Sequence, residues 1–238
     1  MLTVKQAFKT TVGMKFLMAI SGLSLVGFVI LHLAGNLILL QPNGSLFNAY
    51  AEKLASLGPL LEAAEIVLLS LAGMHVMIAF RLKYLATQAR PVGYQLQNSK
   101  KGPSKMDVAS KNLIFTGALL LLFLVVHIKQ FKFGPGIAEG YVQQLDGKSI
   151  RDLHRLVVES FHQPVIVAFY SAAMLFLGMH LKHGIWSAFH SLGATQKRTQ
   201  AFIYSLGLAL AGLLAVGFLL IPVWIYLDLP FRFFGATS

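Results

Sequence analysis

The stretch that decides the fold is FLMAISGLSLVGFVILHLAGNLILL, residues 16–40, in which no side chain is charged. An α-helix rises about 1.5 Å per residue, so this run is long enough to cross the roughly 30 Å hydrocarbon core of a bilayer. A transmembrane β-barrel would instead show alternating strands of about ten residues. The run also exceeds the apolar part of a signal peptide, so we interpret it as a retained membrane helix.

The composition extends this interpretation to the whole chain. Of 238 residues, 56% are hydrophobic and only 12% are charged, about half the share in soluble proteins. We therefore expect an all-α integral membrane protein with a single transmembrane domain over residues 1–238 and no internal repeat. The five predicted transmembrane helices cover residues 16–40, 59–84, 112–133, 161–186 and 200–227. The main connecting segments are then residues 81–111 and 134–159, which we interpret as loops.

The chain contains no cysteine. Disulfides, iron–sulfur clusters and covalently attached haem are therefore excluded from this chain. Any redox chemistry here needs a cofactor that is bound without a covalent link, and any cluster belongs to a partner.

The distribution of basic residues predicts the orientation. With a cytoplasmic N-terminus, the inner side carries 13 of the 20 Lys and Arg residues and one of the nine acidic residues. The positive-inside rule favours this arrangement, which places the C-terminus outside. The net charge of +11 then reflects topology and indicates no nucleic-acid binding. The basic inner face would also suit an acidic soluble partner.

Histidines are the polar residues that stand out within the spans. One lies deep in each of the first four helices, at His32, His75, His127 and His180. At about 1.5 Å per residue, the first and third lie about 24 and 23 Å from the inner end, and the second and fourth about 24 and 28 Å from the outer end. The depths pair His32 with His127 and His75 with His180. This pattern predicts a four-helix bundle that holds two stacked b haems, each with two axial imidazoles.

Other interpretations of these histidines remain open. A buried histidine can bond a backbone carbonyl without any metal, and His183 could replace His180 as the inner ligand. A single zinc site fits less well, because the four side chains are not at one level. Small residues beside the ligands would make room for a macrocycle between the helices. They are Gly35, Gly73, Gly117, Gly178 and Gly184.

Short motifs around these histidines resemble a known family. They are Ser21-Gly22 ahead of His32, HVMIAFR at residues 75–81, Thr116-Gly117 ahead of His127, and HLKHGIW at residues 180–186. Together they resemble the cytochrome b membrane subunit of succinate dehydrogenase and fumarate reductase, in its single-chain, five-helix, two-haem form. The family's His-x-x-x-Gly-x-aromatic pattern favours His180 over His183 as the ligand.

The resemblance implies a complex in a bacterial plasma membrane that serves the respiratory chain and the tricarboxylic acid cycle. A flavoprotein subunit would interconvert succinate and fumarate, and an iron–sulfur subunit would relay electrons. This chain would anchor both in the lipid and exchange electrons with menaquinone or ubiquinone.

Quinone chemistry also moves protons, so a carboxylate or histidine near the outer haem is expected. The candidates are Glu52, Glu65, Glu62 and His162, and the first two rank highest. Further cofactor-binding residues are expected at the inner level or within the bundle. They are Ser21, Thr116, Arg81, Lys83, Lys182 and His183. Some quinol-oxidising members carry a glutamate two residues before the fourth-helix ligand, where this chain has Gly178.

Three alternatives compete with this interpretation. The chain could be the dihaem anchor of another quinone-linked complex, such as a nitrate reductase or a hydrogenase. A transporter that uses histidines for protons would be colourless and would contain broken helices. A purely structural anchor would assemble normally without His32 or His75.

Overall fold

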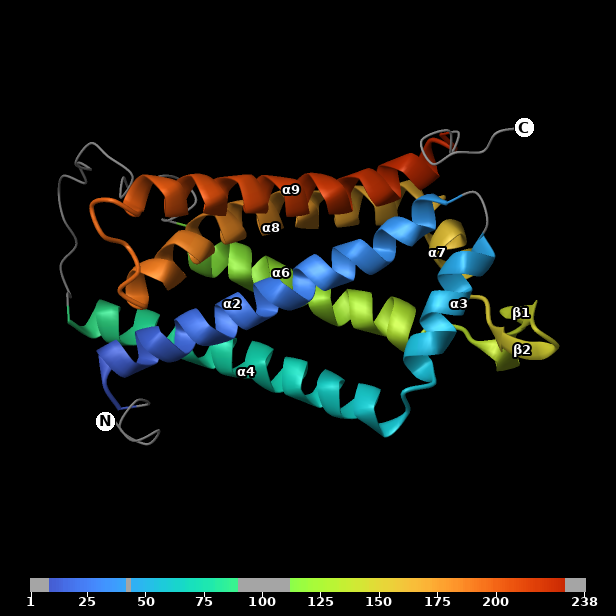
Figure 1. Cartoon of the computed structure of the whole chain (residues 1–238), viewed down its shortest axis with the longest axis horizontal. Coiled ribbons are helices and arrows are strands. Elements are labelled where there is room, and N and C mark those ends of the chain that lie inside the picture. The colour runs from blue at the N-terminus through green and yellow to red at the C-terminus, as the bar shows by residue number, and fades with distance from the viewer. Residues whose placement is uncertain (1–8, 42–43, 90–111, 230–238) are drawn as a thin grey trace. The chain divides into compact units, whose positions relative to one another are not determined.

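The computed structural model describes residues 9–41, 44–89 and 112–229 (Figure 1). Five helices in this part of the chain are long and apolar enough to cross a membrane. The spans are α2 (Thr11–Asn36) continued by the 3-10 helix η1 (Leu37–Leu40), α4 (Pro59–Gln88), α6 (Leu113–His127) continued by the π-helix η2 (Ile128–Lys132), α8 (Pro164–Ser191) and α9 (Gln200–Tyr226). The predicted set of five membrane helices is confirmed to this extent.

The predicted loop between the third and fourth spans contains more structure than expected. It holds the 3-10 turn η3 (Ile137–Glu139), a hairpin of strands β1 (Val142–Leu145) and β2 (Lys148–Arg151), and helix α7 (Leu153–Phe161). The strands are antiparallel, with Val142 opposite Arg151 and Leu145 opposite Lys148. The turn residues Asp146 and Gly147 both have positive φ, as a two-residue hairpin turn requires. A further helix, α3 (Gly44–Ala55), follows the first span.

The fourth span begins later than predicted. Phe161 is the last residue of α7, and α8 begins at Pro164. Proline fits the first position of a helix because it has no backbone N–H to leave unpaired. The apolar residues ahead of it therefore belong to a separate helix, which hydropathy alone merges with the span.

The chain forms two compact units, each built from pieces of the same long helices. Among the described residues, the first unit comprises residues 9–28, 66–89, 112–118 and 177–213, and the second comprises residues 29–41, 44–65, 119–176 and 214–229. In the first unit α9 packs closely on α8, because a Cβ added at Gly207 would lie 3.2 Å from Ile185 Cγ2. In the second unit a Cβ at Gly217 would lie 2.6 Å from Leu33 Cδ2, so α9 packs equally closely on α2. Small residues allow such close approach between membrane helices.

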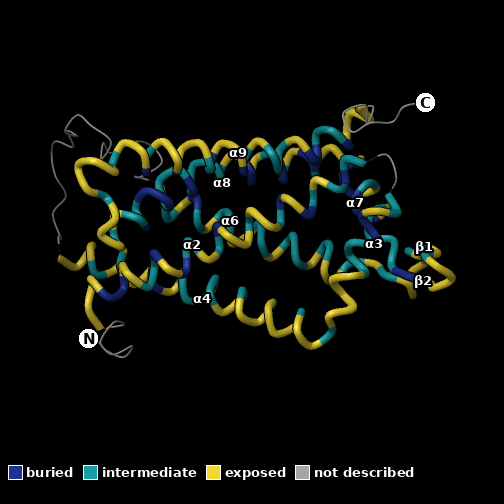
Figure 2. Tube along the Cα trace, viewed as in Figure 1, coloured by how far each residue is buried: buried dark blue, intermediate teal, exposed yellow. Residues whose placement is uncertain are grey.

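The long helices have many exposed residues (Figure 2), and a large number of these are bulky and apolar. Leu60, Ile66 and Met77 of α4 are each about two-thirds exposed in the isolated chain. A soluble protein rarely exposes so many large apolar side chains together, and lipid or a membrane partner would cover them. Two polar residues of the spans, Ser21 and Thr116, are by contrast almost completely buried.

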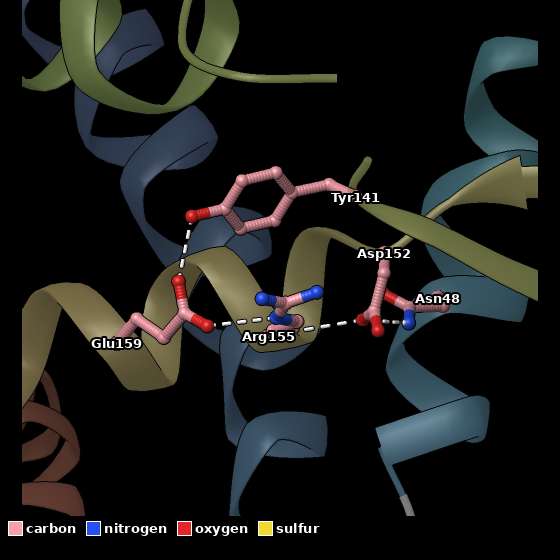
Figure 3. Close-up of polar contacts among 5 residues, drawn as sticks. All are labelled: Asn48, Tyr141, Asp152, Arg155 and Glu159. Atoms are coloured by element: carbon pink, nitrogen blue, oxygen red, sulfur yellow. Dashed lines mark hydrogen bonds and ion pairs between the residues drawn. The ribbon is translucent and has the colours of Figure 1, made fainter. Parts of the chain in front are cut away.

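We call α3, η3, the β1–β2 hairpin and α7 the cap; all four lie in the second unit. Asn48 of α3 is buried and holds the cap together (Figure 3). Its side-chain amide donates to Asp152 Oδ1 at 2.7 Å and to Gln143 Oε1 at 2.5 Å, and its carbonyl accepts from the His154 N–H at 2.8 Å. Asp152 in turn caps α7 by accepting from the Arg155 N–H. One buried side chain therefore joins α3, β1 and the start of α7.

A second set of contacts covers the surface of the cap (Figure 3). Tyr141 Oη donates to Glu159 Oε2 at 2.6 Å, and Arg155 Nε donates to Glu159 Oε1 at 2.7 Å. The tyrosine hydrogen bond, and then the arginine one, hold the pKa of Glu159 below its ordinary range. These exposed groups add local order to α7 and little stability.

Candidate functional site

Two of the predicted histidine ligands face each other in the first unit. His75 comes from α4 and His180 from α8, and their ring centroids lie 6.4 Å apart with planes at 65°. Metal–imidazole bonds of about 2.0 Å on each side, plus about 1.1 Å from each nitrogen to its ring centre, give about 6.2 Å for two imidazoles on one metal ion. The observed separation therefore fits a single metal ion between the two rings.

Buried hydroxyl groups lie beside both rings. Ser21 Oγ of α2 is 3.2 Å from His75 Nδ1, and Thr116 Oγ1 of α6 is 3.2 Å from His180 Nδ1. Both hydroxyl residues are almost fully buried. Ser21 and Thr116 were predicted to bind a cofactor; in the structure their hydroxyl groups contact the predicted ligands His75 and His180, and a role toward a cofactor stays a prediction.

The glycines that follow these hydroxyl residues lie against the same rings. A Cβ at Gly22 would be 3.1 Å from His75 Cε1, and one at Gly117 would be 3.3 Å from His180 Cε1. We predicted that Gly117 makes room for a macrocycle, but it makes room for an imidazole. By contrast, a Cβ at Gly73 or Gly184 would meet no atom within 4 Å. The role predicted for these two glycines toward a macrocycle stays a prediction.

The other two predicted ligands face each other in the second unit. His32 comes from α2 and His127 from the last position of α6, with ring centroids 5.8 Å apart and planes at 89°. The pairing expected from helix depth is thus the pairing that the structure adopts in each unit. Gly35 serves another purpose than predicted, because a Cβ there would lie 2.5 Å from Tyr50 Oη.

Aromatic rings surround His127. The ring centroids of Phe123, Phe131 and Tyr170 lie 5.5, 5.4 and 6.1 Å from it. The Tyr170 hydroxyl donates to Gln130 Oε1 at 3.0 Å and lies 3.4 Å from His127 Nδ1, at the long end for a hydrogen bond. The π-helix η2 begins directly after this histidine. Such turns are frequent at functional sites.

His32 has different surroundings. Its ring lies 5.8 Å from that of Phe218 in α9. The Asn36 amide nitrogen is 3.4 Å from both ring nitrogens and donates a shorter bond, of 2.8 Å, to the His32 carbonyl. Tyr170, Gln130 and Asn36 were not predicted as site residues. The sequence did contain a signal for Tyr170, because a polar side chain in the middle of an apolar span is unusual.

The other predicted cofactor-binding residues also lie in the first unit. Arg81 and Lys83 follow His75 along α4, while Lys182 and His183 follow His180 along α8. The ring that faces His75 is that of His180. Roles for these four residues toward a cofactor stay predictions.

The predicted quinone-site residues all lie in the second unit, and three of them have charged partners. Glu52 pairs with Lys148 at 2.5 Å, and Glu65 pairs with Lys132 at 2.5 Å. His162 Nε2 is 3.1 Å from Asp228 Oδ1. Glu62 lies in the first turn of α4, where the helix dipole favours an acid.

A pocket of about 260 Å³ also lies in the second unit, between α7 and the end of α9. Its walls include Trp224 and the titratable residues His154 and Asp228. Burial lowers the pKa of His154, while the charge of Asp152 opposes that shift. Asp228 has a positive φ of 47° at the end of α9. A benzene-sized ring already fits a cavity of roughly 150 Å³, so this pocket is large enough for a small ring system.

In the described residues the facing histidines meet as pairs and belong to no larger group of potential metal ligands. Within residues 9–41, 44–89 and 112–229, no group of three or more His, Asp or Glu side chains is arranged to hold a metal ion. Structural and catalytic zinc sites use three or four protein ligands. Two facing imidazoles suit a metal that receives its other ligands from a macrocycle.

Comparisons with known proteins add no assignment to this geometry. No family model, no curated protein and no solved structure matches the chain.

Proposed function

We propose that the chain is a dihaem cytochrome b, the membrane anchor and electron-transfer subunit of a succinate dehydrogenase or fumarate reductase complex. One observation carries the proposal: four helices each contribute one histidine, and these side chains meet as two facing pairs, His75 with His180 and His32 with His127. A buried imidazole needs partners for both of its nitrogens, and an iron between two rings provides one for each.

The residues present fit a b-type haem in each unit. A haem held by two imidazoles supplies one-electron transfer without an open coordination position. The first unit offers the 6.4 Å ring separation, hydroxyl partners for Nδ1 and open space beside Gly73 and Gly184. The second unit surrounds His127 with the aromatic rings of Phe123 and Phe131. With no cysteine, the chain would take its electrons from an iron–sulfur partner.

The remaining parts of the proposal rest on the sequence. The motif resemblance supports partnership with an iron–sulfur subunit and a flavoprotein subunit, and quinone as the membrane substrate. The same resemblance supports a bacterial plasma membrane location, and the excess of basic residues on one side supports an N-terminus in the cytoplasm. Proton exchange with quinone would fall to a carboxylate or histidine of the second unit, with Glu52 and Glu65 as the first candidates.

The experiment is a haem-per-chain assay with a reduced-minus-oxidised spectrum on the detergent-purified chain. We expect two b haems in the parent chain and about one in the variants His75→Ala, His180→Ala and His127→Ala. His190→Ala is the matched control, because His190 lies near the end of α8 and is bonded to Thr195. A folded but colourless parent chain would refute the proposal and favour a histidine-dependent transporter. Two haems with different partner subunits after mild purification would instead indicate another quinone-linked complex.

A further inference from the structure

The inference concerns the two buried hydroxyl groups of the first unit. Ser21 and Thr116 each place an oxygen 3.2 Å from the Nδ1 of a predicted ligand on a different helix. Their exposed fractions are 0% and 1%, so no bulk water competes for these contacts. A polar group this deeply buried in an apolar bundle is costly unless its hydrogen bonds are made.

Counting protons gives the direction of both hydrogen bonds. A hydroxyl group has one hydrogen, and that of Ser21 is donated to the backbone carbonyl of Leu17 at 2.9 Å. The hydroxyl of Thr116 likewise donates to the carbonyl of Leu113 at 3.1 Å. Each oxygen must therefore accept from the imidazole, which means that Nδ1 carries the hydrogen. The lone pair of each neutral ring is then on Nε2, the nitrogen left free for a metal.

The following glycine completes the arrangement. With a side chain at Gly22 or Gly117, the ring beside it would be displaced by a few tenths of an ångström, because the added Cβ would lie 3.1 or 3.3 Å from Cε1. The hydroxyl thus fixes the tautomer and the glycine allows the ring to reach it. Neither residue alone would hold the imidazole in this position.

The short motifs that contain these hydroxyl residues and their ligands occur twice in the sequence. The spacing Ser/Thr-Gly-x9-His is found at Ser21-Gly22 with His32 and again at Thr116-Gly117 with His127. A second motif is shared by α4 and α8, the helices that carry His75 and His180. Gly-Met-His occurs at residues 73–75 and again at residues 178–180. Our expectation of no internal repeat did not include these motifs, which relate α2 with α4 to α6 with α8.

We propose that Ser21 and Thr116 are positioning residues that hold the imidazoles of His75 and His180 in the Nδ1–H tautomer, which leaves Nε2 as the nitrogen that would bind the iron. This proposal rests on the proposed function for its metal. A hydrogen bond from Nδ1–H to an oxygen makes the ligand nitrogen a better donor, and removing such partners typically costs 10- to 100-fold in metal affinity. The two hydroxyl groups would thus set both the retention and the reduction potential of this haem.

The test uses three substitutions and one control in the full chain. Thr116→Val keeps the shape of the side chain and removes the hydroxyl, while Thr116→Ser keeps the hydroxyl and removes a methyl group. Ser21→Ala repeats the test on the other ligand. Ser24→Ala is the control, because Ser24 lies one turn along the same helix and is exposed.

We expect Thr116→Val and Ser21→Ala to release one haem about 10- to 100-fold more readily than the parent chain. The reduction potential of that haem should also rise, because a weaker donor favours the ferrous state. Thr116→Ser and Ser24→Ala should match the parent in both readouts. Equal losses in Thr116→Val and Thr116→Ser would show that packing matters and the hydroxyl does not, which would overturn the proposal. Parent-like behaviour of Thr116→Val and Ser21→Ala would overturn it as well.

A second readout separates this proposal from the proposed function. Nitrogen-15 NMR of labelled histidines reports the tautomer of each ring, whether or not haem is bound. We expect His75 and His180 in the Nδ1–H form in the parent chain, and loss of that preference for one ring in each hydroxyl-deleting variant. A colourless chain with these tautomers would refute the haem and keep the positioning. A chain that binds two haems, but has His75 and His180 in the Nε2–H form after haem removal, would support the haem proposal and refute the positioning proposal.

Discussion

Gly22→Ala tests how closely the ligand ring of the first unit is fitted, and Gly27→Ala is its control. Both glycines lie in α2, but a Cβ at Gly27 would meet no atom within 4 Å, whereas one at Gly22 would lie 3.1 Å from His75 Cε1. Carbon atoms prefer separations of about 3.5–4.0 Å, so the ring must move by about 0.5 Å. The bond from His75 Nδ1 to Ser21, already 3.2 Å long, would be lost by that movement.

The expected changes in the free energy of unfolding have opposite signs at Gly22 and Gly27. A lost buried hydrogen bond costs about 1–3 kcal/mol, and overpacking a fitted site costs about the same. Alanine in place of a helical glycine returns roughly 0.5–1 kcal/mol. Gly22→Ala should therefore lower the free energy of unfolding by about 1–5 kcal/mol, while Gly27→Ala should raise it by up to about 1 kcal/mol.

The assay is thermal unfolding in one detergent, followed by circular dichroism, together with the haem content of each variant. We expect Gly22→Ala to unfold at a lower temperature than the parent and to lose haem from one of two centres. Gly27→Ala should keep both haems and unfold at the same or a higher temperature. Equal behaviour of the two variants would refute the close fit at His75.

Three further predictions concern the second unit. Tyr170→Phe should keep the haem of His127, because a contact of 3.4 Å contributes under about 1 kcal/mol, and a spectrum showing one lost haem would contradict this. Asn48→Ala should destabilise the cap by about 2 kcal/mol, seen as roughly 30-fold faster hydrogen exchange in α7, because buried partners lose their bonds. Because burial lowers the pKa of His154, folding keeps its ring neutral while the unfolded chain takes up a proton near pH 6.5. Cap stability should then be full above pH 6.5 and fall below it, with exchange in α7 at pH 7.5 and 5.5 as the measure, and His154→Gln should abolish the difference.

The membrane helices and the histidine pairs could be predicted because both follow from one-dimensional patterns. Apolar runs of spanning length leave few alternatives to helices in a bilayer. A fixed rise per residue then converts the positions of His32 and His127, and of His75 and His180, into depths, and the two pairs meet as those depths require. The helical period also places Ser21 and His32 on one face of α2, because eleven residues are close to three turns.

The cap could not be predicted in the same way. Hydropathy merges Phe161 with the span that begins at Pro164, since a short amphipathic helix and a membrane helix both look apolar at their junction. The role of Asn48 depends on contacts with Gln143 and Asp152, about a hundred residues away in the chain. No local spacing encodes such contacts, because they exist only after the hairpin and α3 have packed.

The repeated helix pairs also bear on the choice among the quinone-site candidates. Aligning Gly-Met-His of α4 with that of α8 relates positions 105 residues apart, which places Glu65 at the position equivalent to Tyr170. Tyr170 of α8 lies beside His127 of α6. By the same relation, Glu65 of α4 is expected on the side of α4 that is nearest His32 of α2. A carboxylate exchanges protons near neutral pH far more readily than a phenol does. Its side chain is 35% exposed and paired with Lys132, so it retains contact with water. These relations favour Glu65 over Glu52, which lies in the cap helix α3 outside the repeat, as the group that would exchange protons with quinone.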